Sequence, residues 1–235
     1  MAKKLKDHVV EGNNIQLRKN IDKIIKKSKF ISRWITKNIE RSEKSVLLSN
    51  ILNAMTEYLE VSKLSIEQHI SILALSTRSI YELNVRLRTL INDEEQKKWA
   101  SESVTDKVQT LEGILSLGTE GENCQQRLIL ENEIKRLQQL TIKYNLPIIK
   151  QPAATGILAK TVDLESEHKG LFKLFSKLVH PSSYLVNDYG NAASSENRKI
   201  LQIHAQLYAH DIVTRLCEDL DIPFEVSKPY GTEEA

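Results

Sequence analysis

The sequence predicts an all-α protein, an antiparallel bundle of roughly six to eight helices in one domain. Helix breakers are scarce, with 8 Gly and 5 Pro among 235 residues. Apolar residues recur at steps of three and four, the spacing of an amphipathic helix, and no stretch alternates as a strand does. We divide the chain into a basic N-terminal helical segment (1–41), a helical bundle (42–220) and a C-terminal tail (221–235).

Two amphipathic helices are expected at the start of the chain. Residues 13–40 hold nine apolar positions in helical spacing, from Ile15 to Ile39. Residues 43–61 repeat this spacing. Serine is a favoured N-cap, so Ser42 is expected to begin the second helix, with Ser45 as the alternative.

Residues 65–91 carry the strongest helical pattern. Ser65 is a candidate N-cap, and Gln68 lies three residues later, as a capping box requires. Apolar residues point in several directions around this helix, which predicts a central position covered on most sides. Arg78 and Glu82 are four residues apart and share a face, so we expect them to pair if that face is buried.

The rest of the chain is predicted from the same signals, namely helical periodicity, N-cap residues and breakers. The expected elements are a polar connector at 93–99, helices at 102–117 and 122–144, short helical pieces at 153–160 and 163–180, a loop at 181–193, a last helix from Ser194 or Ser195 to about 220, and a tail packed through Ile222 and Phe224.

Composition indicates a soluble cytoplasmic protein. No apolar stretch approaches the ~18 residues that span a bilayer, and no apolar run follows the basic residues at the start. Cys124 and Cys217 form no CxxC motif, which is typical of reduced thiols in the cytosol. We therefore expect no membrane partner.

Charge is distributed unevenly along the chain. Residues 1–41 hold 12 Lys/Arg and 4 Asp/Glu, a net charge of +8, whereas the remaining residues have a net charge of −6. A basic segment of this kind is either a surface that contacts phosphates or a solvated helix face.

Motifs of the common enzyme classes are absent. The sequence has no GxGxxG or P-loop, no GxSxG, no HExxH and no EF-hand loop. None of its six histidines has a second histidine four residues away, the spacing of a helical metal site. We expect no cofactor and no bound metal.

The last predicted helix carries a polar stripe. His204, Tyr208, Asp211 and Arg215 follow at i, i+4, i+7 and i+11, which places them within about 60° of one another. The stripe is either a solvated ladder with an Asp211–Arg215 ion pair or one wall of a functional site.

A second candidate site is the stretch FSKLVHPSSYLVN, residues 175–187. Lys173, Ser176, Lys177 and His180 share one face of the predicted helix, and Pro181 ends it. His180 is either a helix-terminal residue stabilised by the macrodipole or a proton-transfer group. In the second case Lys173 and Lys177 would supply positive charge for a phosphate.

The stretches TRSIYELNVRLRTLI and FSKLVHPSSYL together resemble a bacterial family of uncharacterised helical proteins that is similar to HEPN domains. The resemblance implies a helical bundle, often dimeric, of the kind found in toxins and anti-phage systems. Many such proteins cleave RNA without metal through an Arg-x4-6-His motif. Carried onto this chain, the histidine is His180, and the arginine falls at positions 173–175, where Lys173 is the basic residue. The Arg78–Glu82 pair would brace the bundle.

Two functions are therefore expected from the sequence. The first is a non-catalytic binding or sensing module of a bacterial defence or toxin–antitoxin system, acting as a homodimer or with a protein partner of that system, and with RNA as a possible ligand. The alternative is a metal-independent ribonuclease. In the ribonuclease, His180 would be the acid/base, Lys173 and Lys177 the phosphate cations, and His204 with Asp211 a second wall.

Overall fold

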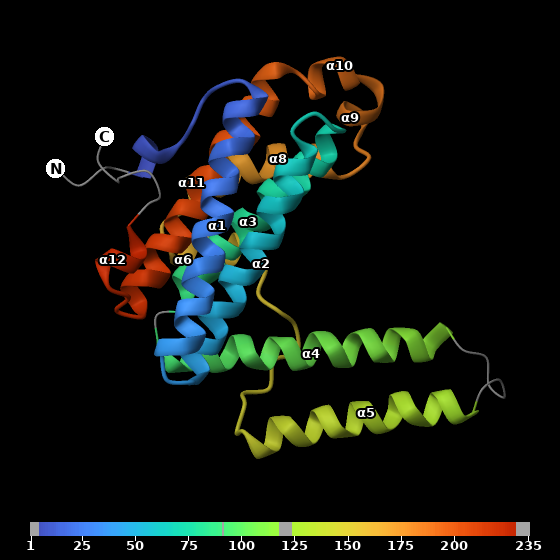
Figure 1. Ribbon diagram of the computed structural model, residues 1–235. Helices are drawn as coiled ribbons and strands as arrows, with labels where there is room; N and C mark the ends of the chain where they lie inside the picture. The colour runs from blue at the N-terminus through green and yellow to red at the C-terminus, as the bar shows by residue number, and fades with distance from the viewer. Residues whose placement is uncertain (1–4, 91, 118–123, 229–235) are drawn as a thin grey trace. The chain divides into compact units, whose positions relative to one another are not determined.

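The computed structural model describes residues 5–90, 92–117 and 124–228, and these residues form helices and connecting segments without a β-strand (Figure 1). The chain divides into two compact units, one made of residues 1–89 with 155–235 and the other of residues 90–154. The prediction of an all-α helical bundle is confirmed at this level. Residues 229–235 of the expected tail lie outside the described part.

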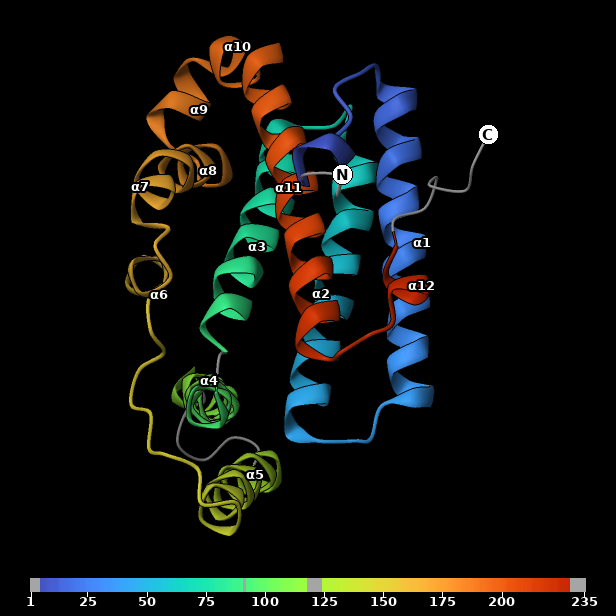
Figure 2. The same cartoon turned by 90° about the vertical axis from the view of Figure 1, so that its left-hand side faces the viewer.

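The first unit contains four long helices, and most of its short helices lie between the third and the fourth of these in the sequence. Figure 2 shows α6 to α10 on one side of α3 and α11, with α1 and α2 on the other side. The helices are α1 (Asn14–Asn38), α2 (Glu43–Ser65), α3 (Ile70–Thr89), α6 (Thr155–Thr161), α7 (Glu165–Glu167), the π-helix η2 (His168–Phe172), α8 (Lys173–Val179), α9 (Ser183–Asn187), α10 (Tyr189–Ala192), α11 (Ser195–Asp219) and α12 (Phe224–Ser227), after a 3-10 turn η1 (Leu5–His8).

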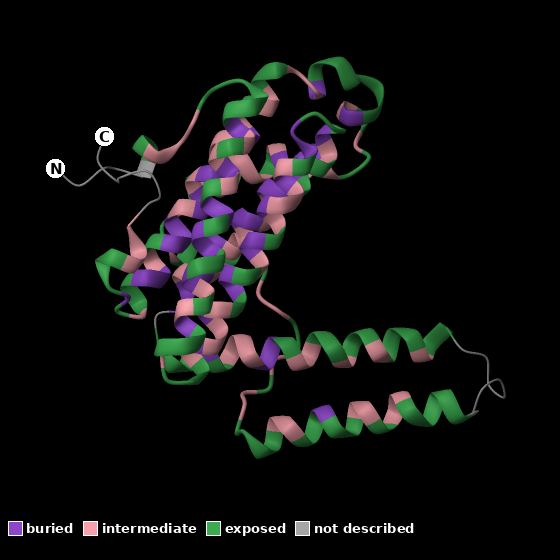
Figure 3. Ribbon diagram, in the orientation of Figure 1, coloured by how far each residue is buried: buried purple, intermediate pink, exposed green. Residues whose placement is uncertain are grey.

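Helix α3 is the centre of this unit, as its sequence predicted. It packs against α2, α11, α8 and α6. Leu73, Ile80 and Tyr81 are fully buried, and the buried residues in Figure 3 concentrate in α1, α2, α3 and α11. Because α3 touches helices from both ends of the chain, it fixes the positions of side chains that are remote in sequence.

Helix N-caps fix the starts of the long helices. Ser42 accepts a hydrogen bond from the Ser45 backbone and forms a reciprocal capping box with it, so both predicted candidates take part in one cap. Ser194 caps α11 by accepting from the Asn197 backbone. At α1, Asn13 and Gln16 form another capping box.

The predicted boundary at Ser65 is wrong. Helix α2 runs on to Ser65, and α3 begins only at Ile70. The Ser65 hydroxyl donates to the Ser62 carbonyl of its own helix at 3.0 Å, so this serine is buried inside a helix end rather than capping the next one. A cap-like residue can use its hydroxyl in this way within a helix.

Two further predicted connectors are helical. The expected loop at 181–193 contains α9, whose cap is Ser182 accepting from the Leu185 backbone, and α10. The expected connector at 93–99 belongs to a continuous helix α4 (Asp93–Leu117). Asn92 accepts from the Glu95 backbone at its start, and acidic residues in the first turn favour a helix N-terminus.

The helix expected over 163–180 is divided into α7, η2 and α8, so a π-helical stretch interrupts it. In the tail, Ile222 is buried as expected, but Phe224 is 72% exposed, so the expected packing of Phe224 is wrong.

The second unit pairs α4 with α5 (Cys124–Lys143). The Ser101 hydroxyl donates to the Pro147 carbonyl, and Thr105 donates to the Ile149 carbonyl at 2.7 Å, so the segment after α5 runs along α4. Leu137 is the buried apolar residue of α5. No helix in the described part of the chain is long and apolar enough to cross a membrane.

Candidate functional site

Arg78 of α3 lies next to His180, which the sequence had singled out. Arg78 Nη1 is 3.1 Å from His180 Nε2. Arg78 Nε donates to Glu82 Oε1 at 2.9 Å, and the guanidinium carbon lies 4.6 Å from the centre of the Phe172 ring. The expected Arg78–Glu82 pair is present. The pair uses Arg78 Nε, so Nη1 remains directed at the His180 imidazole.

The backbone at the end of α8 brings His180 to this position. Helix α8 ends at Val179, and His180 adopts an extended conformation (φ −86°, ψ 154°) while its N–H donates to the Ser176 carbonyl at 3.2 Å. Proline disfavours the α region for the residue that precedes it, so Pro181 favours the extended conformation of His180. His180 is thus both the C-cap of α8 and an exposed partner of Arg78.

The hydrogen bond between the two side chains has one possible direction. Arginine carries donors only, so Arg78 donates and His180 Nε2 accepts. An anion placed between them could instead accept from the guanidinium and from a protonated imidazole. Charge-assisted bonds of that kind are the stronger ones in proteins. The pair can therefore bind a phosphate oxygen or move a proton.

A layer of aromatic and polar side chains supports Arg78 from within the bundle. His168 stacks on Phe172 with ring centres 4.3 Å apart, and both come from the π-helix η2. The Tyr81 hydroxyl is 3.1 Å from His168 Nδ1. Burial lowers the pKa of His168, with Glu82 opposing this effect and Arg78 adding to it. His168 is therefore neutral at physiological pH.

Helix α11 joins this layer through a short hydrogen bond. The Tyr208 hydroxyl donates to Glu167 Oε1 at 2.6 Å, and the Tyr208 and Tyr81 rings lie 5.2 Å apart. Burial raises the pKa of Tyr208, and the negative charge of Glu167 raises it further. Both tyrosines stay protonated and act as hydrogen-bonding groups that fix the segment before α8.

Lys173 and Lys177 are the residues predicted as phosphate cations. Both are exposed. By helical spacing they lie on the side of α8 opposite to the buried Phe175 and Leu178. The described contacts bring neither lysine to Arg78 or His180.

Asp211 lies in a buried ion cluster, because it is only 7% exposed. Its Oδ2 accepts from Asn84 Nδ2 at 2.7 Å, from Arg88 Nη2 at 2.8 Å and from Arg215 Nε at 2.9 Å. The expected Asp211–Arg215 pair therefore forms, but not as a solvated ladder. The cluster joins α11 to α3.

His204, the other residue of the predicted second wall, makes its contacts along its own helix. Its Nδ1 is 2.8 Å from the Ile200 carbonyl, and its ring centre is 5.7 Å from that of Tyr208. No described contact joins His204 to His180. Phe172 and His168 were not predicted as neighbours of the site, and Arg78 was expected only to brace the bundle. Arg78 is the single charged residue from Ile70 to Tyr81, and this was the signal in the sequence that could have identified it.

Within the described ranges, no three or more His, Cys, Asp or Glu side chains gather as a metal site would require. Arg78 contacts His180, and Tyr81 and His168 lie in the layer behind it.

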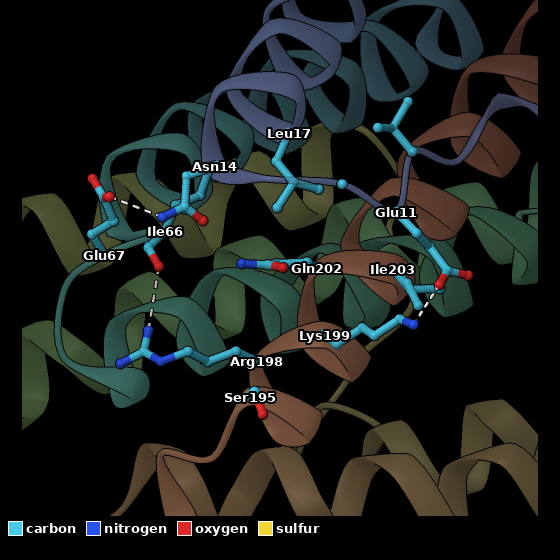
Figure 4. Close-up of a pocket in the computed structure, with 12 residues that line it drawn as sticks. Glu11, Asn14, Leu17, Ile66, Glu67, Ser195, Arg198, Lys199, Gln202 and Ile203 are labelled. Carbon is cyan, nitrogen blue, oxygen red and sulfur yellow. Dashed lines mark hydrogen bonds and ion pairs between the residues drawn. The ribbon is translucent and has the colours of Figure 1, made fainter.

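A separate cavity of about 680 Å³ lies between the N-terminal arm and the start of α11 (Figure 4). The charged side chains in its wall each have a hydrogen-bonding partner within the protein. Lys199 pairs with Glu11 at 2.6 Å, Glu67 accepts from Asn14 at 2.8 Å, and Arg198 donates to the Ile66 carbonyl at 3.3 Å. Two of these side chains are acidic and two are basic, so their formal charges sum to zero.

Comparisons with known proteins agree with a domain of uncharacterised function. No curated protein and no solved structure matches the chain significantly. Residues 44–198 match a family of unknown function, DUF5677. The match covers more than half of the chain, from the start of α2 to the start of α11, and includes Arg78, Phe172 and His180. The chain belongs to this family of unknown function.

Proposed function

We propose that the chain is an RNA-binding module, and that the Arg78–His180 pair is its phosphate site. The observation that supports this function is the 3.1 Å contact between Arg78 Nη1 and His180 Nε2 at an exposed helix end. A guanidinium fork matches the geometry of a phosphate. The adjacent imidazole offers a second nitrogen that can donate a hydrogen bond to a phosphate oxygen.

Preorganisation strengthens the argument. Glu82 holds Arg78 Nε, and Phe172 lies under the guanidinium plane, so the side chain is oriented before any ligand arrives. Orienting a long side chain in advance reduces the entropy that binding must overcome. An RNA phosphate would replace the Arg78–His180 hydrogen bond with contacts to both groups.

Binding without cleavage is the function that these contacts favour. General acid–base cleavage of an RNA phosphodiester needs one group that accepts a proton and one that donates a proton. Of the two residues predicted as a second wall, Asp211 already accepts four hydrogen bonds inside the bundle, and His204 is bonded within its own helix. Among these three residues, His180 is the exposed one that contacts Arg78, so it is the one placed to transfer a proton.

The alternative is a metal-independent ribonuclease that uses His180. It is favoured by the identity of the two partners, because an arginine and a histidine are also the residues of the RNA-cleaving motif that the sequence resembles. Here the arginine would come from α3 instead of positions 173–175. A homodimer would supply the second His180 that such a reaction could use.

The biological setting in this proposal rests on the resemblance. We propose a HEPN-like antiparallel bundle, of bacterial origin and located in the cytoplasm. It would act in a defence or toxin–antitoxin system, as a homodimer or with a protein partner of that system.

Equilibrium binding to a labelled RNA, measured by fluorescence anisotropy across a salt series, tests the proposal. Arg78→Ala should weaken binding by about 10- to 150-fold, the range for a hydrogen bond to a charged group. The slope of log affinity against log salt should fall by about 0.7, the value for one single-strand phosphate. Arg127→Ala is a matched control, because Arg127 forms the same i,i+4 pair with Glu131.

Two results would contradict the proposal. One is equal affinity of the Arg78→Ala and Arg127→Ala proteins when circular dichroism shows both to be folded. The other is wild-type binding with no dependence on salt. Incubation of the RNA with wild type and His180→Ala in EDTA tests the alternative: cleavage that disappears in the variant would establish the ribonuclease.

A further inference from the structure

We propose that the ligand of this site is single-stranded RNA, and that His69 and Tyr189 form a platform on which one of its bases stacks. The proposal rests on the proposed function. It adds the class of RNA and two residues that contact one of its bases. These two residues form an aromatic pair on the surface of the first unit.

His69 and Tyr189 are exposed, and their rings contact each other in a tilted arrangement. Their ring centres are 4.9 Å apart with an interplanar angle of 36°. Tyr189 is 41% exposed, and His69 is exposed as well. His69 Nδ1 is 2.6 Å from the Ser71 hydroxyl, which fixes the ring. A fixed aromatic surface in contact with solvent is what base stacking requires, because every base has a π-face.

The platform lies on the same side of α3 as the phosphate site. Ser71 contacts His69 and lies seven residues before Arg78 on α3. The two positions therefore differ by about 20° around the helix and by about 10 Å along it. Figure 1 shows α9 and α10 following α8 towards the beginning of α3, and this segment carries the chain from His180 to Tyr189. Both partners of the platform are therefore placed by the elements that place the Arg78–His180 pair.

The length of this strip suits a short stretch of RNA. About 10 Å corresponds to roughly three stacked nucleotides at 3.4 Å per nucleotide. Between the two ends, Leu75 is 46% exposed and lies about 60° around α3 from Arg78. A cationic group at one end, an apolar side chain near the middle and an aromatic pair at the other end match a phosphate followed by unpaired bases.

This arrangement selects single strands on physical grounds. In a duplex the base faces are covered by their neighbours in the stack, so a platform that contacts base faces needs unpaired or terminal bases. Duplex RNA could reach Arg78 through its phosphates but would gain nothing from Tyr189. The site should therefore prefer single-stranded RNA over a duplex of the same sequence.

The test compares one labelled RNA strand alone and annealed to its complement. Tyr189→Ala should weaken single-strand binding by about 5- to 150-fold, the range measured for base–aromatic stacking. The salt slope should stay unchanged, because no phosphate contact is lost. Duplex binding should not change, and Tyr189→Phe should bind as wild type does. Tyr144→Ala, at another exposed tyrosine, is the control.

The outcomes separate this proposal from the function on which it rests. If Arg78→Ala loses binding while Tyr189→Ala and His69→Ala bind like Tyr144→Ala, RNA binding stands and the platform is refuted. Preference of wild type for the duplex also refutes it. If wild type binds neither RNA, the proposed function itself fails. His69→Ala repeats the test from the other ring, should Tyr189→Ala fail to fold.

Discussion

Replacing Asp211 by alanine should destabilise the first unit strongly, because it removes the acceptor at the centre of a buried ion cluster. Asn84, Arg88 and Arg215 all donate to the same Asp211 oxygen at 2.7–2.9 Å. Arg88 is itself largely covered, with 23% of its side chain exposed. The substitution leaves this charge without its counter-ion between α3 and α11.

The size of the effect follows from this burial. Removing one partner of a buried ion pair costs about 3–5 kcal/mol, since the remaining charge stays desolvated. An exposed pair is worth about 0.3–0.5 kcal/mol. Glu165→Ala, which breaks the exposed pair with Lys169 in the same unit, is the matched control. The two substitutions should differ in unfolding free energy by about 3 kcal/mol or more.

Urea unfolding followed by tryptophan fluorescence measures this difference. Trp34 lies on α1 in the first unit and Trp99 lies on α4 in the second, so a Trp99→Phe background reports the first unit alone. The double variant Asp211→Ala with Arg88→Met should recover part of the loss, because both charges are then gone.

A loss below about 1 kcal/mol for Asp211→Ala would refute the reasoning, since such a value belongs to an exposed pair. It would mean that Asp211 is free to serve in the second wall predicted from the sequence. Failure of the double variant to recover any stability would likewise show that the charge of Arg88 is not what makes the single substitution costly.

Three further predictions concern stability. Burial lowers the pKa of His210 to about 4, with neighbouring His8 lowering it further, so the native state holds this ring neutral while the unfolded chain binds a proton below about 6.5. Stability should therefore fall by about 2 kcal/mol from pH 7 to pH 5, and urea midpoints of His210→Gln should show a weaker dependence. A Cβ added at Gly156 would lie 2.9 Å from His168 Nε2, so Gly156→Ala should cost about 1–3 kcal/mol in thermal unfolding, whereas Gly113→Ala, with open space around it inside α4, should stabilise by up to about 1 kcal/mol. Ser42→Ala removes a capping box and should cost about 1 kcal/mol in urea unfolding, which Ser42→Asp should largely restore.

Local signals in the sequence predicted the long helices well where caps and periodicity agreed. Ser42 and Ser194 mark true helix starts, because a cap acts on backbone groups only two or three residues away. The same logic failed at Ser65, whose hydroxyl bonds back into α2. Local sequence does not distinguish these two uses of a serine, and the packing around the helix end decides between them.

The candidate site could be predicted only in part. The segment around His180 was identified from its proline and its helix-like spacing, which are local properties. Its partner Arg78 is 102 residues away, and only the packing of α8 on α3 brings them together. The sequence spacing had instead favoured Lys173, which faces away from the buried side of α8. Long-range pairs of this kind depend on tertiary structure, and periodicity carries no information about them.

The surroundings of Asp211 also depend on tertiary structure that the sequence pattern does not show. The stripe on the last helix was visible in the sequence, and the Asp211–Arg215 pair within it was expected. Asn84 and Arg88, which convert the stripe into a buried cluster, come from a different helix. Whether a polar stripe is solvated or buried is thus set by what packs on it.

The division of the first unit into two stretches of sequence has a consequence for synthesis. Helix α3 is complete early, but α11, which covers it, ends roughly 130 residues later. At 5–20 residues per second a ribosome needs about 7–26 s to make that stretch. During this time the apolar faces of α1, α2 and α3 lack their last neighbour, while the 90–154 unit is already whole. The nascent chain therefore emerges with an uncovered core and is a natural client for chaperones that hold exposed apolar helices until the C-terminal part arrives.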